Sequence, residues 1–513
     1  MPHPSPIAGV SPNPFARRDV LKAAAAAVAG TLPLSSAFAQ NKPAEPQRPA
    51  IEGYLLPLSV KAKDKVRLHV STTSPYFSVE IARVGATREV VWTKDAVAGK
   101  NYPVPPDAST HGCRWPAAVE LDVPTTWRTG YYSVKLRATG VGGDKGEGDA
   151  FFVVRPDHPG RDAKILLQLT TNTYDAYNDW GGSSLYVGGS EPLQGVRVSF
   201  ERPLPRGFLS KPSGQLNRWS PYAGWHNWER AFVAWAEQAG YKIDYAINSD
   251  LEFHRELLTH YRLVLSVGHD EYWSRPMRDN LEAFIERGGN VAFFSGNTCY
   301  WQVRSESDGK ALISYKRRYL EDPYFKSENY AELSTLWSNR LIRRPENQLT
   351  GVSFNYGGYH RFRSVPRGAG GYTIHRPEHW IFDGTELKWG DLLGTENQIV
   401  GYECDGCDFV VRNNLPVPTH RDGTPDTFQI LGTAPAQGWE NEVNFAVEGL
   451  FGPDATQEEI DRIIRGSAVL GIYTRGGTVF TTGCTEWSRG LEQDNPLVDR
   501  ITRNLLDRLS GPT

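Results

Sequence analysis

Neither sign of charge predominates in this sequence of 513 residues. Its 56 lysines and arginines nearly balance 59 aspartates and glutamates, which leaves a formal net charge of -3. A protein that binds nucleic acid through the phosphates gathers basic side chains in a patch or a run. The sequence contains no such block of lysine and arginine interleaved with aromatic residues. We therefore expect no nucleic-acid partner.

Several catalytic motifs are also missing. The sequence has no GxSxG nucleophile elbow, no HExxH zinc motif, no GxxxxGK[ST] phosphate loop and no GxGxxG that opens a helix after a strand. These absences disfavour serine hydrolases, zinc proteases and nucleotide-binding enzymes. No apolar run after the first forty residues reaches the length of a membrane span, so we expect no membrane partner.

Cysteine is scarce, and its five positions are Cys113, Cys299, Cys404, Cys407 and Cys484. An odd number of cysteines cannot all pair within one chain, so disulfides do not organise the fold. The spacing of Cys404 and Cys407 favours a local disulfide or two free thiols over half of a zinc site, because no second CxxC follows. Cys299 is a minor candidate for a nucleophile, since no activating base is evident.

Residues 1–39 resemble a twin-arginine export signal. Arg17 and Arg18 precede a moderately apolar, alanine-rich run, and small residues precede a cleavage site after Ala39. A membrane anchor is the less favoured alternative, because the run is short and is interrupted by glycine and proline. We therefore expect a periplasmic or secreted protein. This export route carries folded proteins, often with a cofactor inserted, which favours a metal or another prosthetic group.

The rest of the chain predicts two domains. Residues 51–156 alternate short apolar runs with turn residues and predict an accessory β-sandwich of immunoglobulin-like size. Residues 160–510 alternate apolar strands with amphipathic helices, which predicts an α/β domain built on a parallel sheet. Further strands are expected at GVSF, LLGT, IVGYEC, AVLGIYT and TVFTTG, and an irregular surface excursion at residues 415–438.

Two polar clusters follow apolar strands in the segment 263–297. His269, Asp270 and Glu271 end one strand, and Asn297 ends the next. In open α/β sheets ligands bind outside the carboxyl ends of the strands, so these side chains lie where chemistry is usually done. The structural alternative is a helix cap, in which Asp270 or Ser274 accepts hydrogen bonds from helix amides and His269 packs nearby.

A series of motifs in residues 160–510 resembles one family, with the preceding sandwich also fitting. The motifs are NTYDAYNDWGGSSLY, VSFERP, GHDEYWS, GGNVAFFSGNTCYWQVR, EHWIFDGTELKWGD and VGYE. They are similar to the C-terminal domain of the large (beta) subunit of N,N-dimethylformamidase and its relatives. The resemblance implies a glutamine-amidotransferase-like α/β fold. It also implies amide hydrolysis by a mononuclear iron that two tyrosines and a glutamate hold.

Carried over by motif, the resemblance assigns roles to seven residues. The metal ligands would be Tyr177, Tyr186 and Glu271. The second tyrosine is open, because Tyr174 and Tyr222 are also available. His269 and Asn297 match polar groups beside the metal, Glu403 matches a carboxylate able to act as general base, and Lys316 matches a pocket lysine.

The chemistry of these residue types agrees with that assignment. Two phenolates and a carboxylate are hard anionic donors, which favour Fe(III) over zinc or copper. The metal would polarise a carbonyl and lower the pKa of a bound water. Glu403 would take a proton, and Asn297 and His269 would donate hydrogen bonds to a developing oxyanion.

Three functional hypotheses follow. The first is an exported, iron-dependent amidohydrolase that cleaves a C–N bond of a small amide, as a homo-oligomer or with a small partner subunit. The second is a non-catalytic exported protein whose aromatic loops bind a glycan or another envelope ligand. The third is metal-independent hydrolysis by Glu271 and His269, or by Cys299.

Overall fold

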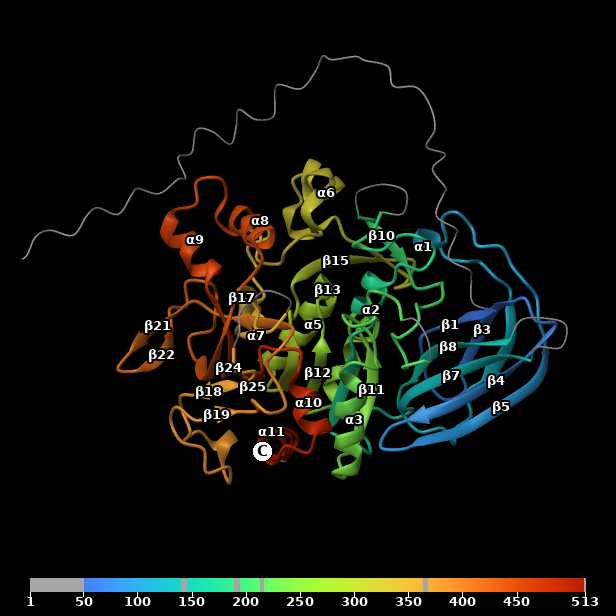
Figure 1. The fold of residues 1–513 in the computed structure, drawn as a ribbon, viewed down its shortest axis with the longest axis horizontal. Helices are drawn as coiled ribbons and strands as arrows, with labels where there is room; N and C mark the ends of the chain where they lie inside the picture. The colour runs from blue at the N-terminus through green and yellow to red at the C-terminus, as the bar shows by residue number, and fades with distance from the viewer. Residues whose placement is uncertain (1–49, 140–144, 189–193, 213–215, 363–367, 512–513) are drawn as a thin grey trace, which may run out of the picture. The chain divides into compact units, whose positions relative to one another are not determined.

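The computed structural model describes residues 50–511, except for 140–144, 189–193, 213–215 and 363–367 (Figure 1). The export signal predicted for residues 1–39 lies outside the described residues. Within the described ranges, no helix is both long enough and apolar enough to cross a membrane.

Residues 51–154 form two sheets around one apolar core. A three-stranded sheet has the order β1-β3-β6, and a five-stranded sheet has the order β2-β8-β7-β4-β5. Along β3, Val66, Leu68 and Val70 are buried, whereas Lys65 and Arg67 face solvent. This alternation is that of a strand with one face against a core, and both sheets contribute to that core.

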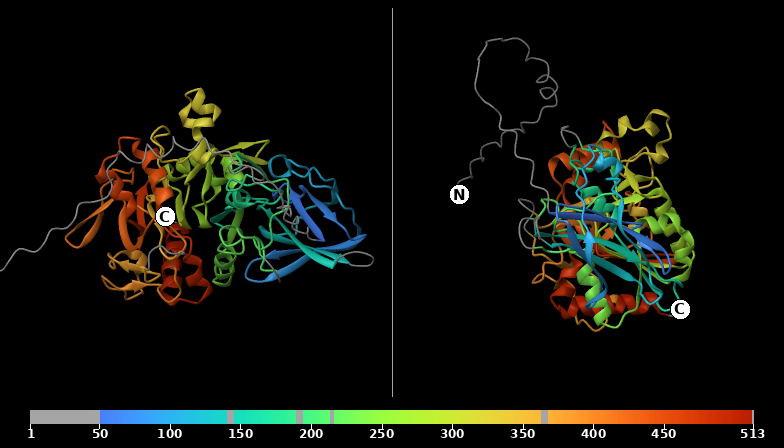
Figure 2. Two further views of the ribbon diagram at one scale, coloured as in Figure 1. Left: turned by 45° about the horizontal axis from the view of Figure 1, so that its top comes forward. Right: turned by 90° about the vertical axis from the view of Figure 1, so that its right-hand side faces the viewer.

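The elements of this region are β1 (Ile51–Leu56), β2 (Ser59–Val60), β3 (Lys65–Thr72), β4 (Tyr76–Val84), β5 (Arg88–Ala98), α1 (Ala108–His111), β6 (Ala117–Asp122), β7 (Gly130–Thr139) and β8 (Lys145–Val154). Strands β7 and β8 contact β11 (Ile243–Ile247), the edge strand of the next sheet. The two sets of sheets therefore lie side by side (Figures 1 and 2).

A nine-stranded sheet is the centre of the α/β region, with the order β11-β9-β12-β14-β25-β24-β23-β18-β19. Strands β11, β9, β12, β14 and β25 are parallel, whereas the pairs from β25 to β19 are antiparallel. The sheet is therefore mixed, and the expected parallel pairing applies to five of its strands. The other bounds are β9 (Ile165–Leu169), β12 (Leu263–His269), β14 (Asn290–Gly296), β18 (Tyr372–Ile374), β19 (Leu392–Leu393), β23 (Gln429–Ala436), β24 (Gly466–Arg475) and β25 (Gly477–Thr481).

Helices cover both faces of this sheet. Leu265 and Val267 of β12 share a core with α3 (Glu229–Gln238), α10 (Trp487–Glu492) and α11 (Pro496–Ser510). Val264 faces the other way, toward a core that includes α4 (Asn248–Phe253) and α5 (Arg275–Glu286). Because β12 is buried on both sides, its residues are apolar almost throughout rather than alternating.

The remaining elements form smaller units. A four-stranded sheet has the order β10-β16-β15-β13, and β17-β20 and β21-β22 are two-stranded. Their bounds, with the remaining helices, are α2 (Thr171–Tyr177), β10 (Arg197–Ser199), η1 (Arg255–His260), β13 (Tyr272–Ser274), β15 (Trp301–Glu306), β16 (Ala311–Ile313), η2 (Lys316–Glu321), α6 (Pro323–Lys326), η3 (Tyr330–Glu332), α7 (Asn347–Thr350), β17 (Ser353–Tyr359), η4 (Trp380–Phe382), β20 (Glu403–Gly406), β21 (Phe409–Arg412), β22 (Leu415–Pro418), α8 (Glu440–Phe451) and α9 (Gln457–Ile464).

The prediction of an irregular surface excursion at residues 415–438 is wrong for residues 415–418 and 429–436, which form β22 and β23, whereas residues 419–428 lie in neither helix nor strand. Strand β23 lies inside the nine-stranded sheet, and Ile430 and Leu431 are fully buried. Gly432 and Pro435 made the segment look like a loop, but a bulge between Ile430 and Gly432 accommodates this sequence in the strand. The strand expected at IVGYEC also differs, because β20 begins only at Glu403.

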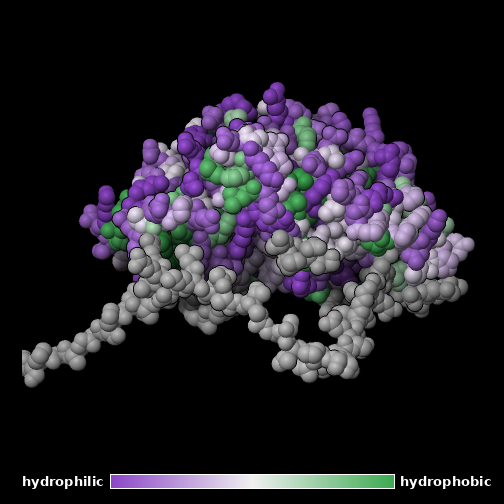
Figure 3. Space-filling model, turned by 90° about the horizontal axis from the view of Figure 1, so that it is seen from above, coloured by the Kyte–Doolittle hydropathy of each residue, from purple (hydrophilic) through white to green (hydrophobic). Residues whose placement is uncertain are grey.

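The face in Figure 3 is mostly hydrophilic, with small separate apolar areas. Large apolar side chains that stay exposed include Val411 of the β21–β22 hairpin at 67% and Trp389 at 57%. Single exposed apolar side chains are normal for a globular protein. Surface composition therefore does not locate a functional site.

Candidate active site at the carboxyl ends of the central strands

Three neighbouring parallel strands end at one edge of the sheet. Strand β9 leads into α2, β12 ends at His269 and β14 ends at Gly296, opposite His269. Strand β20 crosses this edge so closely that a Cβ atom on Gly296 would lie 2.4 Å from the backbone oxygen of Glu403. Glycine at 296 therefore lets Glu403 approach the residues that follow β12.

Two phenols and a carboxylate meet at this edge. The Tyr186 Oη lies 2.9 Å from the Tyr177 Oη, and 2.8 and 2.9 Å from the two carboxylate oxygens of Glu271. The indole N–H of Trp301 donates to Glu271 Oε1 at 2.7 Å. Tyr177 and Glu271 are buried, and Tyr186 is half-buried. The three predicted ligands therefore converge, although 85 residues separate Tyr186 from Glu271.

His269 links this cluster to a second carboxylate. Its Nε2 lies 2.6 Å from Glu403 Oε2 and 3.3 Å from Glu271 Oε2. Its Nδ1 lies 2.7 Å from the backbone oxygen of Tyr222. A carbonyl oxygen can only accept, so Nδ1 carries a hydrogen, and Nε2 is the nitrogen beside the carboxylates, although its geometry does not make a hydrogen bond to either. Asn297 donates from Nδ2 to Glu403 Oε2 at 3.3 Å, so the structure brings His269, Asn297 and Glu403 together.

The charges of these groups depend on one another. Burial alone would lower the pKa of His269, but the carboxylates of Glu403 and Glu271 raise it well above its ordinary value. Burial would raise the pKa of Glu271, yet His269 and the positive charge of Lys316 lower it. Burial and the charge of Glu271 raise the pKa of Tyr177 and Tyr186 well above the usual value for a phenol. Both phenols are therefore harder to ionise than a free phenol.

Lys316 lies on the tyrosine side of the cluster. Its Nζ donates to the Tyr272 hydroxyl at 2.9 Å and to the Leu185 carbonyl at 3.3 Å, and it lies 3.4 Å from the centroid of the Tyr186 ring. Burial lowers the pKa of Lys316 to about 7, against the opposing charge of Glu271. The Tyr272 hydroxyl in turn donates to Tyr186 Oη at 2.7 Å.

The two alternative tyrosines lie elsewhere. The Tyr174 hydroxyl donates to Glu229 Oε1 at 2.6 Å, in a buried network that also includes Thr170. Tyr222 contributes its backbone oxygen to His269, and its ring packs against Tyr402 with the centroids 5.3 Å apart. Of the candidate tyrosines, Tyr186 has the contacts expected of the second ligand.

Two neighbours of the site were not predicted. Tyr272 and Trp301 both contact the cluster of phenols and carboxylate directly. Each stands inside a motif already quoted, GHDEYWS or TCYWQVR, but an aromatic residue beside a strand is more often a core residue. The sequence alone therefore did not show that the Tyr272 hydroxyl and the Trp301 indole belong to the site.

The structural alternative for this segment is partly right. Ser274 caps α5, because its Oγ accepts from the backbone nitrogen of Met277. Asp270 does not cap the helix. Its carboxylate accepts instead from the side chains of Gln168, Asn248 and Ser266.

The donor set fits a hard cation. Within the described residues no group of three or more His, Cys, Asp and Glu side chains is arranged to hold a metal ion. The oxygens of Tyr177, Tyr186 and Glu271 form a different kind of set, because two of the three donors are phenols. Beside them, Asn297 Oδ1 is buried with no hydrogen-bond partner. Such oxygen donors suit Fe(III) better than zinc or copper.

All five cysteines are free and buried. Cys404 and Cys407 do not pair with each other, and the Cys404 Sγ lies 3.7 Å from the Cys484 Sγ. Burial raises the pKa of the Cys299 thiol far above its ordinary value. A thiol is a much poorer nucleophile than a thiolate, so this environment disfavours nucleophilic catalysis by Cys299.

Comparisons with known proteins identify the same family that the sequence motifs resemble. A family model described as "N,N-dimethylformamidase beta subunit-like, C-terminal" matches residues 78–499, so the match begins within the sheets of the N-terminal region. The N,N-dimethylformamidase beta subunit of Paracoccus aminophilus is 24% identical over 444 residues, which cover 77% of this chain and 54% of that protein. The beta subunit from Alcaligenes sp. is 23% identical over 447 residues, with the same coverage of 77% and 54%.

The chain thus spans about half the length of the curated relatives that it matches. The family model, in contrast, covers most of the chain. This chain therefore belongs to the N,N-dimethylformamidase beta subunit-like, C-terminal family.

Proposed function

We propose that this protein is an exported amidohydrolase that cleaves the C–N bond of a small amide. Its cofactor is a mononuclear Fe(III) with Tyr177, Tyr186 and Glu271 as ligands. The observation that carries the proposal is the position of Tyr186 Oη, within 2.9 Å of the Tyr177 oxygen and of both Glu271 oxygens. The names of the relatives support amide hydrolysis.

The same proposal includes architecture and location. Residues 51–156 are an immunoglobulin-like sandwich, residues 160–510 are a glutamine-amidotransferase-like domain, and residues 1–39 direct twin-arginine export to the periplasm. The relatives are named as beta subunits, which supports a partner subunit for this chain as well, and a homo-oligomer is the alternative assembly.

The residues around the proposed ligands carry out different steps of the proposed hydrolysis. When bound, iron would act as a Lewis acid that polarises the amide carbonyl and lowers the pKa of water. Glu403 accepts a proton from the water that attacks the carbonyl carbon. Asn297 orients that carboxylate by donating from Nδ2 at 3.3 Å, and His269 donates its Nε2 hydrogen, which has no hydrogen-bond partner among the described residues, toward the developing negative charge. The proton on Glu403 then passes to the leaving nitrogen as the C–N bond breaks, giving a carboxylic acid and an amine.

Metal analysis of the purified protein tests the ligands. We expect stoichiometric iron and a coloured phenolate-to-iron absorption band in the wild type. Glu271→Ala loses the iron, and Tyr177→Phe loses most of the iron and changes the band. Tyr174→Phe is the matched control, because it removes an equally buried phenol that bonds to Glu229 instead. Unchanged iron content in both Glu271→Ala and Tyr177→Phe would remove the ligand assignment.

A cluster of aromatic side chains keeps the glycan-binding alternative open. Tyr359 stacks on Trp439 with the ring centroids 4.7 Å apart and on Phe362 at 5.3 Å, and Tyr402 connects these rings to His269. Tyr359 itself is buried, whereas Phe362 and Trp439 are half-buried, and partly exposed aromatic faces such as these also stack on sugars. A metal-free, inactive protein that is retarded on a polysaccharide column would favour this second function over hydrolysis.

A further inference from the structure

Both tyrosine ligands of the proposed site lie in one short segment, residues 175–186. It begins in the last turn of α2 and continues as a loop through Gly181 and Gly182, both at positive φ. The segment is closed by hydrogen bonds of its own, such as Leu185 N to the Ala176 carbonyl at 3.1 Å and Gly182 N to the Asp179 carbonyl at 3.0 Å. Contacts from other parts of the chain fix its position relative to the rest of the site. The parts that reach it include the turn after β10, the N-terminal region and residues 217–219, where the Asn217 amide donates to Asp179 Oδ1 at 2.9 Å.

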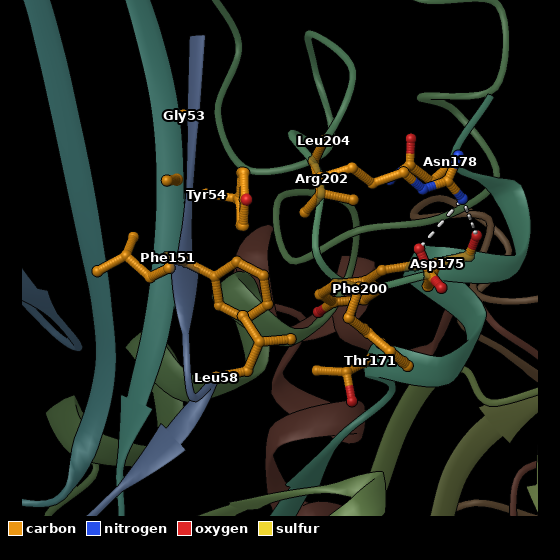
Figure 4. Close-up of a pocket in the computed structure, with 13 residues that line it drawn as sticks. Gly53, Tyr54, Leu58, Phe151, Thr171, Asp175, Asn178, Phe200, Arg202 and Leu204 are labelled. Atoms are coloured by element: carbon orange, nitrogen blue, oxygen red, sulfur yellow. Dashed lines mark hydrogen bonds and ion pairs between the residues drawn. The ribbon is translucent and has the colours of Figure 1, made fainter. Parts of the chain in front are cut away.

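The turn after β10 contributes Arg202, which is fully buried (Figure 4). Its Nη1 donates to the backbone oxygens of Trp180 at 2.7 Å and Ser183 at 3.1 Å. Its Nη2 donates to the Asp175 carboxylate at 3.2 Å and to the Asp175 carbonyl at 3.4 Å. One guanidinium thus joins three points of the segment, spaced around Tyr177.

The N-terminal sheets hold the opposite side of the loop. The half-buried indole of Trp180 donates from Nε1 to Glu52 Oε1 of β1 at 2.7 Å, and its ring meets Trp115 edge-on at 5.8 Å. The Ser183 hydroxyl lies 2.6 Å from the hydroxyl of Ser109 in α1. Figure 4 shows a neighbouring part of this boundary, where Gly53 and Tyr54 of β1 lie across from Arg202 and Asp175.

Unlike ordinary contacts between domains, these contacts are made by residues that lie between the two proposed tyrosine ligands in the sequence. Trp180 and Ser183 stand between Tyr177 and Tyr186, so a shift of either moves at least one phenol. A metal site tolerates only about 0.5 Å of displacement of its ligands. Removing an outer group that orients a ligand typically weakens metal binding by about 10- to 100-fold.

We propose that Trp180 is a positioning residue of the iron site, held between Glu52 of β1 and Arg202 so that Tyr177 and Tyr186 point at Glu271. The N-terminal sheets are then part of the active-site scaffold rather than a separate accessory. The inference rests on the proposed function, because it concerns the affinity of the same ligands for iron.

Two variants of the full-length protein test this role. Trp180→Phe removes the indole N–H and keeps an aromatic ring beside Trp115, and Glu52→Ala removes the acceptor. The matched control is Trp235→Phe, which removes an indole–carboxylate bond of 2.8 Å to Asp499, between α3 and α11. We expect iron affinity to fall about tenfold or more in both test variants, with a shifted phenolate-to-iron band, and to be unchanged in the control.

Further measurements make the test specific. The double variant of Trp180→Phe and Glu52→Ala should lose little more affinity than either single variant, because both break one bond. Glu52→Gln keeps an acceptor oxygen and should restore most of the affinity. Amide hydrogen exchange of residues 171–186, measured without metal, should become faster in the test variants and not in Trp235→Phe.

The outcomes separate this inference from the proposed function. A wild-type protein that binds no iron overturns the proposed function and with it the role of Trp180 at an iron site. Iron binding in the wild type, with affinity and exchange in both test variants equal to those of Trp235→Phe, overturns the positioning role alone.

Discussion

Two pairs of buried acidic residues are close neighbours in the sequence, but the two members of each pair have different surroundings. Asp270 and Glu271 are consecutive, and Glu403 and Asp405 are two residues apart. Glu271 and Glu403 face groups that titrate: a phenol and the imidazole of His269. Asp270 and Asp405 face groups that do not.

The neutral donors around the two aspartates belong to the scaffold. Asp270 accepts from Ser266 Oγ at 2.7 Å and from two side-chain amides. Asp405 accepts from the backbone nitrogens of Asn297 at 2.8 Å and Thr298 at 3.1 Å. An acid that ties neutral donors together supports the fold, whereas an acid opposite an exchangeable proton is available for catalysis.

The largest expected effect is on Glu403. Glu403→Gln keeps the size of the side chain and removes the proton acceptor, so we expect kcat to fall by roughly 100- to 10,000-fold. Iron content and the midpoint of urea unfolding should remain close to those of the wild type. A variant that keeps full activity would show that Glu403 belongs with the scaffold acids.

The second effect concerns stability. Asp270→Ala removes the acceptor of Ser266 and of two buried amides, so we expect the free energy of unfolding to fall by about 3 kcal/mol. Urea unfolding measures this change. Asp279→Ala, an acid on the exposed side of α5, is the control and should change the free energy of unfolding by less than about 0.5 kcal/mol. Equal losses in the two variants would contradict the supporting role of Asp270.

The third effect is a dependence of stability on pH. Burial raises the pKa of Asp405 from its ordinary value of 3.8 to about 8. The folded state therefore keeps a proton that the unfolded state releases near pH 4, and this contribution to stability is lost as the pH rises from about 4 to about 8. Asp405→Asn should flatten the profile in that window, as measured by the unfolding free energy at several pH values. An unaltered slope would mean that Asp405 is ionised in the folded state.

The smallest effect is expected at Ser274, which follows the same strand end. Ser274→Ala removes the cap of α5, so the free energy of unfolding should fall by about 1 kcal/mol. Amide hydrolysis and iron content should not change, because the Ser274 hydroxyl bonds to Met277 and Glu252 rather than to the phenols. If Ser274→Ala lost iron, Ser274 would contribute to the iron site as well as to the cap of α5, and this prediction would be wrong.

Much of this site could be predicted from the sequence because several of its residues directly follow strands. The apolar runs at 263–269 and 290–296 predicted where His269 and Asn297 would meet, and the motif positions of Tyr177, Tyr186 and Glu271 predicted three oxygens that the structure brings together. Their roles as iron ligands remain a prediction.

Other features had no local signal. The antiparallel half of the nine-stranded sheet depends on pairing between distant segments, and the buried strand at Gln429–Ala436 contains glycine and proline that predicted a loop. The bond between Trp180 and Glu52 spans 128 residues. Periodicity describes one element at a time, so it cannot predict such contacts.

The bond between Trp180 and Glu52 also matters for protein engineering. A fragment that begins at residue 160 would retain Tyr177, Tyr186 and Glu271 but would lose the partners that β1 and α1 supply. Grafting the tyrosine loop of a relative into this chain would fail for the same reason unless the matching N-terminal residues are transferred with it. Chimeras should therefore exchange residues 51–202 as a single block.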